Sequence, residues 1–96
     1  MSDGYDDLQT VFDAALAHAS EGKGKERHAN GRPFDRQPMM EISRMVGPGF
    51  PLGQAIKKAQ ESLGMVDRGD LSAAEAECLG AINYLAGAIL WMRERG

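Results

Sequence analysis

The sequence predicts an all-α fold: a small helical domain of about four helices with a long buried C-terminal helix, assembling as a homo-oligomer. Three observations predict it. Apolar residues recur at helical spacing in several segments, no segment alternates polar and apolar residues as a strand does, and residues 72–95 hold a nearly unbroken apolar run without proline. Because 96 residues suffice for one small core only, we expect a single domain spanning 1–96.

The first predicted helix covers residues 5–19. Aspartates at its start suit the positive end of the helix dipole, and its apolar positions follow the i, i+3, i+4 spacing of one face. We expect this face to pack on the rest of the chain. Its residues are Leu8, Val11, Phe12, Ala15, Leu16 and Ala19.

Residues 20–37 form a predicted basic loop, because they contain three glycines and lack apolar periodicity. Five lysines and arginines outnumber three acidic residues there. Two interpretations stay open: a solvated linker, or an anion-binding arm in which Arg27, His28 and Arg32 hold phosphate oxygens. Phe34, near the end of the loop, is expected to anchor it in the core.

A short helix is predicted over residues 38–46. Pro38 suits its first position, where a missing N–H is harmless, Asp35 or Gln37 can cap it, and Gly47 ends it. The residues expected to point inward are Met39, Ile42, Met45 and Val46.

A third helix is predicted over residues 51–63, after a Gly-Pro-Gly corner and before Gly64. Gly53 has no side chain and would let another backbone approach closely. The expected buried stripe of this helix is Leu52, Ala55, Ile56, Ala59 and Leu63.

The last helix, residues 72–95, organises the prediction. Ser72 and Glu75 match a capping box at its start. Between Cys78 and Met92 only Asn83 is strongly polar, so the helix should be buried on all sides, yet its apolar run of about 15 residues is too short to span a membrane. We therefore expect a second copy to cover it. Cys78, the only cysteine, is interpreted as a small buried side chain.

Composition narrows the function classes. The net charge of −3 disfavours general nucleic-acid binding, and the acidic N-terminus lacks a signal-peptide pattern, so we expect a cytoplasmic protein (in the host cell, if a phage encodes it). The sequence contains no G-x-x-x-x-G-K-[ST] phosphate loop, and its glutamates do not cluster on one helix face. We assign no catalytic residue, metal ligand or cofactor.

Anion recognition is the chemistry that recurs. Lys57 and Lys58 follow a glycine-rich corner at a helix start, where free amides favour phosphate. Adjacent residues diverge by about 100°, so only one of the two shares a face with Gln54 and Glu61. An alternative is a surface ion pair between Lys57 and Glu61. Four rings are candidates either for stacking on a base or for the core: Phe34, Phe50, Tyr84 and Trp91.

Two motifs carry a family resemblance. After the acidic short helix, residues 50–57 read FPLGQAIK, and residues 81–85 read AINYL. The segment 38–94 thereby resembles the SaV-like family of small phage proteins, which includes an unorthodox deoxynucleoside monophosphate kinase that forms a large oligomer. The resemblance implies a nucleotide-handling oligomer with Gly53, Gln54 and Lys57 as pocket residues.

Three functions follow as expectations. The first is a phage-type oligomer that sequesters a nucleotide-derived ligand at subunit boundaries, as an anti-defence sponge for a cyclic nucleotide or an ADP-ribose-type signal. The second is a deoxynucleoside monophosphate kinase, which would use Mg²⁺. The third is a protein that inhibits a host enzyme by binding it. The predicted ligand-binding residues are Arg27, His28, Arg32, Phe34, Gly53, Gln54, Lys57, Lys58 and Asn83.

Overall fold

The computed structural model describes residues 4–21 and 32–96, and the regular structure in these ranges is entirely helical. The predicted all-α class is therefore confirmed, whereas the homo-oligomer stays a prediction. In chain order the elements are α1 (Asp6–Glu21), the 3-10 turn η2 (Phe34–Arg36), α2 (Pro38–Val46), α3 (Gly49–Asp67) and α4 (Leu71–Arg95).

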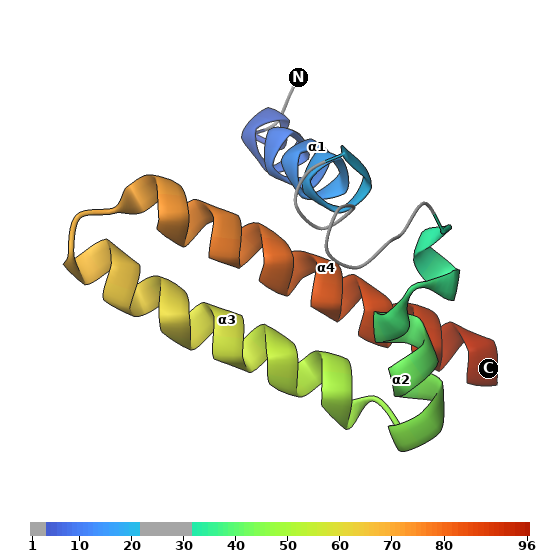
Figure 1. Cartoon of the computed structure of the whole chain (residues 1–96). Coiled ribbons are helices and arrows are strands. Elements are labelled where there is room, and N and C mark those ends of the chain that lie inside the picture. Colours follow the sequence, from blue (N-terminus) through green and yellow to red (C-terminus); the bar gives the residue numbers. More distant parts are fainter. Residues whose placement is uncertain (1–3, 22–31) are drawn as a thin grey trace.

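The helices α3 and α4 lie side by side as an antiparallel hairpin (Figure 1). Gly69, with a φ of 79°, makes the turn between them. Its N–H donates to the carbonyl of Val66, and the N–H of Asp70 donates to the carbonyl of Met65, both at 2.9 Å. These two bonds form a Schellman motif, which satisfies carbonyls at the end of α3. The helix therefore ends at this motif, after Asp67, and not before Gly64 as predicted.

The start of α4 corrects the predicted capping box. Asp70 is the N-cap, and its Oδ1 accepts a hydrogen bond of 3.1 Å from the N–H of Ala73. The helix begins one residue earlier than predicted, so Ser72 and Glu75 already lie inside it. An aspartate at this position satisfies a free amide and also complements the positive end of the dipole.

Small residues form the contacts of α4 with its neighbours. The buried residues of α4 are Ala74, Gly80, Gly87 and Ala88. A Cβ built on Gly87 would overlap the side chain of Met39 and lie 3.7 Å from the sulfur of Met40, so α2 packs directly on this glycine. Met40 is completely buried there. The core is thus a close approach of helices rather than a cluster of large side chains.

In the single chain α4 is not buried on all sides, and the expectation that a second copy covers the rest stays a prediction. Several of the larger apolar side chains of α4 are open to solvent, and Leu85, Ile89 and Met92 are 46–49% exposed. Cys78, predicted to be buried, is exposed as well. Small side chains are enough for α4 to pack against α1, α2 and α3. The remaining face of α4 is not covered by the described part of the chain.

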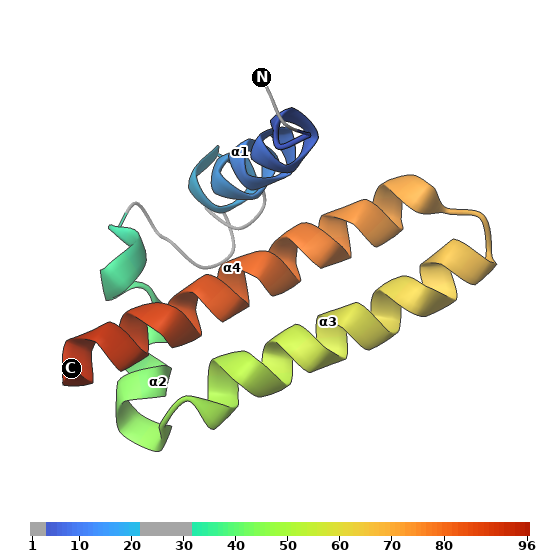
Figure 2. The same ribbon diagram turned by 180° about the vertical axis from the view of Figure 1, so that it is seen from behind.

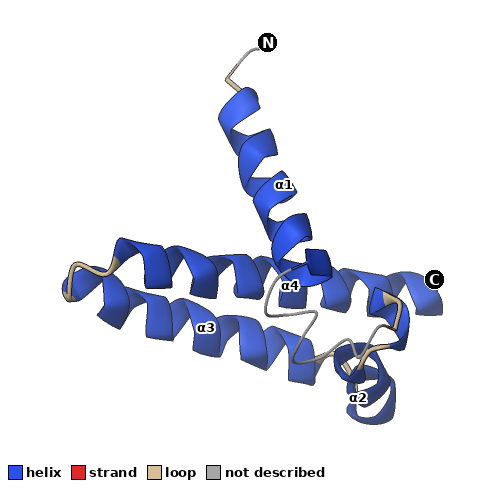
Figure 3. Ribbon diagram, turned by 45° about the horizontal axis from the view of Figure 1, so that its top comes forward, coloured by secondary structure: helices blue, strands red, loops and turns tan. Residues whose placement is uncertain are grey.

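The stripes predicted for the other helices are corrected in the same sense. On α1 only Ala15 is buried, because this helix crosses α4 near its C-terminal end and projects from the hairpin (Figure 3). On α2, Met40 and Ser43 are buried, and Met39 is half-buried against Gly87 as predicted, whereas Ile42, Met45 and Val46 are exposed. On α3, Ala55 is buried, whereas Ile56, Ala59 and Leu63 are exposed and Leu52 is half-buried.

The ends of α2 match their prediction. Pro38 occupies the first turn after the N-cap Gln37, and Gly47 ends the helix with a φ of 97°. Arg44 fixes α2 to the end of α4, because its Nε and Nη2 donate to the two carboxylate oxygens of Glu94 at 3.0 and 2.7 Å. This bidentate pair lowers the pKa of Glu94 and raises the pKa of Arg44. None of the helices in residues 4–21 and 32–96 has the length and hydrophobicity of a membrane span.

Candidate functional site

Two adjoining cavities lie on the side of the hairpin that faces α1 and η2. The first, about 470 Å³, lies between α1, η2 and α4 and reaches Leu90; we call it the Leu90 cavity. The second, about 360 Å³, also borders α3 at Lys58; we call it the Lys58 cavity. Both volumes fall in the range typical of small-molecule sites, about 300–1,000 Å³. The residues lining both cavities are Ala19, Phe34, Gln37 and Asn83.

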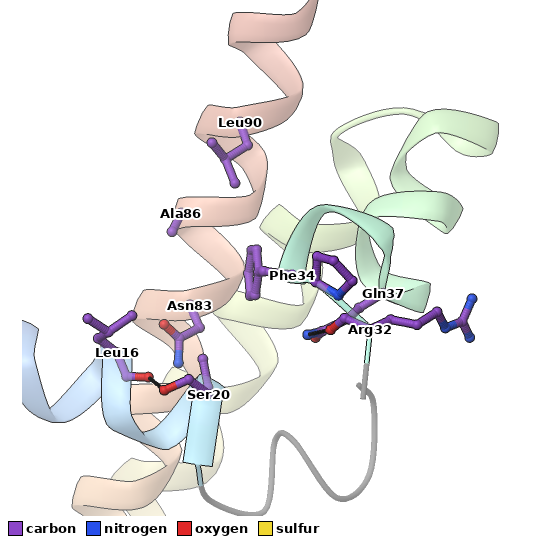
Figure 4. Close-up of a pocket in the computed structure, with 10 residues that line it drawn as sticks. Leu16, Ser20, Arg32, Phe34, Gln37, Asn83, Ala86 and Leu90 are labelled. Atoms are coloured by element: carbon purple, nitrogen blue, oxygen red, sulfur yellow. Dashed lines mark hydrogen bonds between the residues drawn. The ribbon is translucent and has the colours of Figure 1, made fainter. Parts of the chain in front are cut away.

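Phe34 borders both cavities. Its ring is half-buried and points from η2 towards α4 (Figure 4). The short 3-10 turn behind it is held by Gln37, whose buried side-chain amide donates to the carbonyl of Arg32 at 3.1 Å. Gln37 therefore stabilises the turn with its side chain rather than capping α2 with it. The predicted anchoring role of Phe34 is met in part, because the ring also borders open space on both sides.

Lys58 supplies the positive charge of the second cavity. Its Nζ donates to Glu77 of α4 at 3.4 Å and lies 5.9 Å from the centre of the Tyr84 ring. Its aliphatic stem runs over Gly80, where an added Cβ would come within 2.9 Å of Cδ. Glycine at position 80 thus leaves the channel through which this lysine reaches the cavity.

Tyr84 forms the floor beside Lys58. Its ring packs edge-on against Phe50, with a centroid distance of 6.2 Å and an interplanar angle of 85°. Burial raises the pKa of the Tyr84 phenol, so the hydroxyl stays protonated and can donate a hydrogen bond at neutral pH. Of the predicted stacking rings, Phe34 and Tyr84 line the cavity, whereas Trp91 lies under the guanidinium of Arg95 at 4.1 Å.

Asn83 joins α4 to α1. Its side-chain amide donates to the carbonyl of Ala15 at 2.9 Å, which explains why a polar residue is tolerated in the apolar part of α4. The carboxamide also borders both cavities. His18 of α1 also lines the Lys58 cavity.

The structure brings together some of the predicted site residues and separates others. Phe34, Lys58 and Asn83 line the Lys58 cavity, and Arg32 lines the Leu90 cavity. The Arg32 guanidinium points away from Phe34 and lies 3.6 Å from Glu41 (Figure 4).

Three further predicted residues lie on α3 away from both cavities. Gly53 and Lys57 are exposed, and Gln54 is half-buried. Lys57 is about 12 Å along the helix from the first residue of α3, Gly49, so the lysine and the free amides do not converge. Arg27 and His28 lie outside the described residues.

His18, Gln37 and Glu77 line the Lys58 cavity but were not predicted to be site residues. Glu77, Gly80 and Tyr84 have the 3–4 spacing of one helix face, and a glycine between two polar groups on such a face indicates a gap for another side chain. This signal was available for α4. The partners on α1 and η2 come from distant segments, and their approach depends on the tertiary fold.

The Lys58 cavity is mainly apolar, and it is lined by aromatic rings, a lysine ammonium group and side chains that can donate hydrogen bonds. Such a site suits a flat anionic molecule: the rings stack, Lys58 holds the charge, and Asn83 or Tyr84 reads a polar edge. Among the described residues, no group of three or more His, Cys, Asp and Glu side chains is arranged to hold a metal ion. Searches against protein-family models, curated proteins and solved structures find no match for this chain.

Proposed function

We propose that the protein is a homo-oligomeric binding protein that captures a small anionic ligand with an aromatic ring, of the nucleotide class, in the Lys58 cavity. The observation that carries the proposal is the convergence of Phe34, Lys58, Asn83 and Tyr84 from three separate elements around one hollow of about 360 Å³. In this proposal the ligand binds inside each protomer, whereas the sequence alone led us to expect binding at subunit boundaries.

The chemistry of the cavity supports capture of the ligand. Phe34 and Tyr84 offer ring faces to a base, and a phosphate oxygen would compete with Glu77 for the Nζ of Lys58. Among the described residues that line the cavity, Lys58 and Glu77 form an ion pair whose charges cancel, so a ligand anion must draw the lysine away from its carboxylate. The resemblance to the SaV-like phage proteins implies a nucleotide-handling oligomer, and capture of a host defence signal such as a cyclic nucleotide or an ADP-ribose derivative would make this protein an anti-defence sponge.

Isothermal titration tests this proposal. We expect heat of binding with at least one member of a panel of cyclic dinucleotides, ADP-ribose and deoxynucleoside monophosphates. Inorganic phosphate, which lacks a ring, should bind much more weakly. An absence of binding across the whole panel would contradict the proposal. Formation of a nucleoside diphosphate with ATP and Mg²⁺ would instead identify the phosphotransferase alternative.

Two adjacent lysines provide a matched control. Lys58→Ala removes the cation that reaches the cavity, and losing a charge-assisted hydrogen bond of about 1.5–3 kcal/mol should weaken binding by about 10- to 100-fold. Lys57→Ala removes an equal charge one residue away, on the exposed side of α3, and should leave affinity unchanged. Equal losses from both variants would argue against the Lys58 cavity as the site.

The exposed apolar stripe of α1 favours a second candidate function, a protein that inhibits a host enzyme by binding it. Leu8, Val11, Phe12 and Leu16 are 44–67% exposed. In that case Phe12→Asp should abolish binding of the partner enzyme and leave nucleotide titration unchanged. If Phe12→Asp changes neither binding of the partner enzyme nor nucleotide titration, this second function is contradicted and ligand capture stays the proposed function.

A further inference from the structure

We infer that the side of the α3–α4 hairpin that faces away from the cavities is the surface through which two copies of this chain pack together. The inference rests on the assembly part of the proposed function and assigns it to particular residues. It is independent of the Lys58 cavity, which lies on the other side of the hairpin.

The position of this surface follows from the contacts inside the hairpin. Lys58 on α3 faces Glu77 on α4, and Tyr84 faces Phe50. The residue that follows an inward one is turned by about 100° around its helix, and because the helices are antiparallel, this turn leads to the same side of the hairpin on both. On each helix these positions repeat at alternating intervals of three and four residues. We call them the outer face: Leu52, Ile56, Ala59, Leu63 and Val66 of α3, with Leu71, Cys78, Ile82, Leu85, Ile89 and Met92 of α4; Glu75 occupies the remaining position of the α4 row, between Leu71 and Cys78.

The residue that precedes an inward one lies on the opposite side. Gly80 and Asn83 line the Lys58 cavity, and Gly87 contacts α2. The cavities, α1 and α2 are thus gathered on one side of α4, and the outer face is on the other. Figure 2 looks at the hairpin from the side away from α2, and no other described helix lies in front of α3 and α4 in that view.

The outer face is apolar and largely open in the single chain. The exposed fractions are 70% for Ile56, 63% for Leu63 and 65% for Leu71. The only charged residue that interrupts the two rows is Glu75, near the start of α4. A contiguous apolar patch of this kind is rare on a monomer and marks an interaction surface.

The accessible surface area of the chain is larger than that of a typical folded monomer of the same mass. The chain exposes 6461 Å², whereas a folded monomer of 10.4 kDa exposes about 5,400 Å². Its radius of gyration is 14.1 Å, against about 12.5 Å for a compact domain of this length. The outer face and the projecting helix α1 both contribute to the excess area of roughly 1,000 Å², which compares with the about 800 Å² that each partner contributes to a standard protein interface.

A second copy of the hairpin is the partner that this face fits. Rows with alternating intervals of three and four residues pack into one another at the shallow crossing angles of helical bundles. Two copies related by a twofold axis would each present two such rows, and together they make a four-helix bundle with the outer faces inside it. Each copy would keep its cavities on the outside of that bundle.

The mass in solution tests this inference. We expect the wild-type protein to have a mass of at least twice 10.4 kDa in multi-angle light scattering. Leu85→Glu and Ile56→Glu, one on each helix, bury a charge in the proposed contact and should reduce the mass at least twofold while circular dichroism stays helical. Gln60→Glu adds the same charge to an exposed position of α3 outside the outer face and should not change the mass.

Cys78 supplies a second readout on the unmodified protein. In the paired state its thiol is covered, so alkylation by a maleimide should be slow at high protein concentration and should accelerate on dilution. This measurement decides the matter if a glutamate variant fails to fold. A wild-type protein that has the mass of one chain, or whose thiol reacts at one rate at every concentration, would overturn the inference. Variants that lose mass but keep nucleotide binding would separate it from the ligand proposal.

Discussion

The two sides of the α3–α4 hairpin use the same helices in opposite ways. The side towards α1 and α2 is built from small residues, such as Gly80 and Gly87, and from polar groups with partners, such as Lys58 and Asn83. The outer face carries the large aliphatic side chains and, apart from Glu75, no charge. Close packing within the chain has been achieved by glycine and alanine, which leaves leucine and isoleucine for contacts with something else.

The largest effect is expected where the inner side is packed most tightly. Met40 is completely buried beneath α4, whereas Met45 on the same helix is 81% exposed. Met40→Ala should lower the free energy of unfolding by about 2–5 kcal/mol, because it leaves a cavity. Met45→Ala should change it by less than about 0.5 kcal/mol. Urea denaturation monitored by circular dichroism measures both, and equal effects would contradict the contrast between the sides.

A pair of glycines sharpens the contrast. Gly87→Ala puts a methyl group against the end of the flexible Met39 side chain, which must move; alanine's helix propensity offsets about 1 kcal/mol of the overpacking, so the net cost should be at most about 2 kcal/mol. Gly53→Ala on α3 meets nothing within 4 Å and should stabilise the protein by up to about 1 kcal/mol, because alanine is the better helix former. Thermal unfolding of both variants should therefore shift in opposite directions. A lower melting temperature for Gly53→Ala in the assembled protein would show that another backbone approaches this glycine.

A third prediction concerns the connection between α1 and α4. Asn83→Ala removes the donor to the carbonyl of Ala15 and should cost about 1 kcal/mol, the usual net value of one hydrogen bond. Because α1 has few other buried groups, we expect hydrogen exchange of its amides to accelerate while exchange in α3 stays unchanged. Asn83→Asp serves as the comparison, since it preserves size but cannot donate from its side chain. Unchanged exchange in α1 would show that other contacts hold this helix.

The smallest effect belongs to the exposed pair that joins α2 to α4. Since the pKa of Glu94 is lowered in the folded protein, its contribution is present above its ordinary pKa and is lost as the pH falls through the lowered value. The difference in stability between the wild type and Glu94→Gln should thus be constant near neutral pH and disappear in acid. Salt should weaken it too. A difference that grows as the pH falls from 7 would contradict this sign.

The sequence predicted the helices better than the faces by which they pack. The ends of α2 at Pro38 and Gly47 have a local cause, and the predicted boundaries are confirmed. The stripes were assigned by hydrophobicity, which identified Ile56 and Leu63 as apolar but could not determine whether a neighbour in the same chain covers them. The periodicity of large side chains on α3 and α4 belongs to the outer face, while the inner contacts are made by residues too small to dominate such a pattern.

The candidate site was predictable only in its chemistry. Phe34, Lys58 and Asn83 were identified by residue type, and all three line one cavity. Lys57 and Lys58 could not be distinguished, because the choice depends on which face of α3 meets Glu77 across the hairpin. The pairing of Arg32 with Glu41 also depends on the path of the chain between η2 and α2.

The glycine and alanine contacts of α4 have a consequence for how this protein can vary. In most small domains the bulky aliphatic positions are the ones that resist replacement, and glycines in helices are dispensable. In this chain the pattern of tolerated substitutions is reversed. Adding one carbon at Gly87 disturbs the packing of α2 on α4, whereas replacing Leu85 with a smaller residue opens no cavity in the single chain. Substitutions that leave the isolated subunit intact will therefore concentrate among the large hydrophobic residues of the outer face, whereas Met40 remains sensitive.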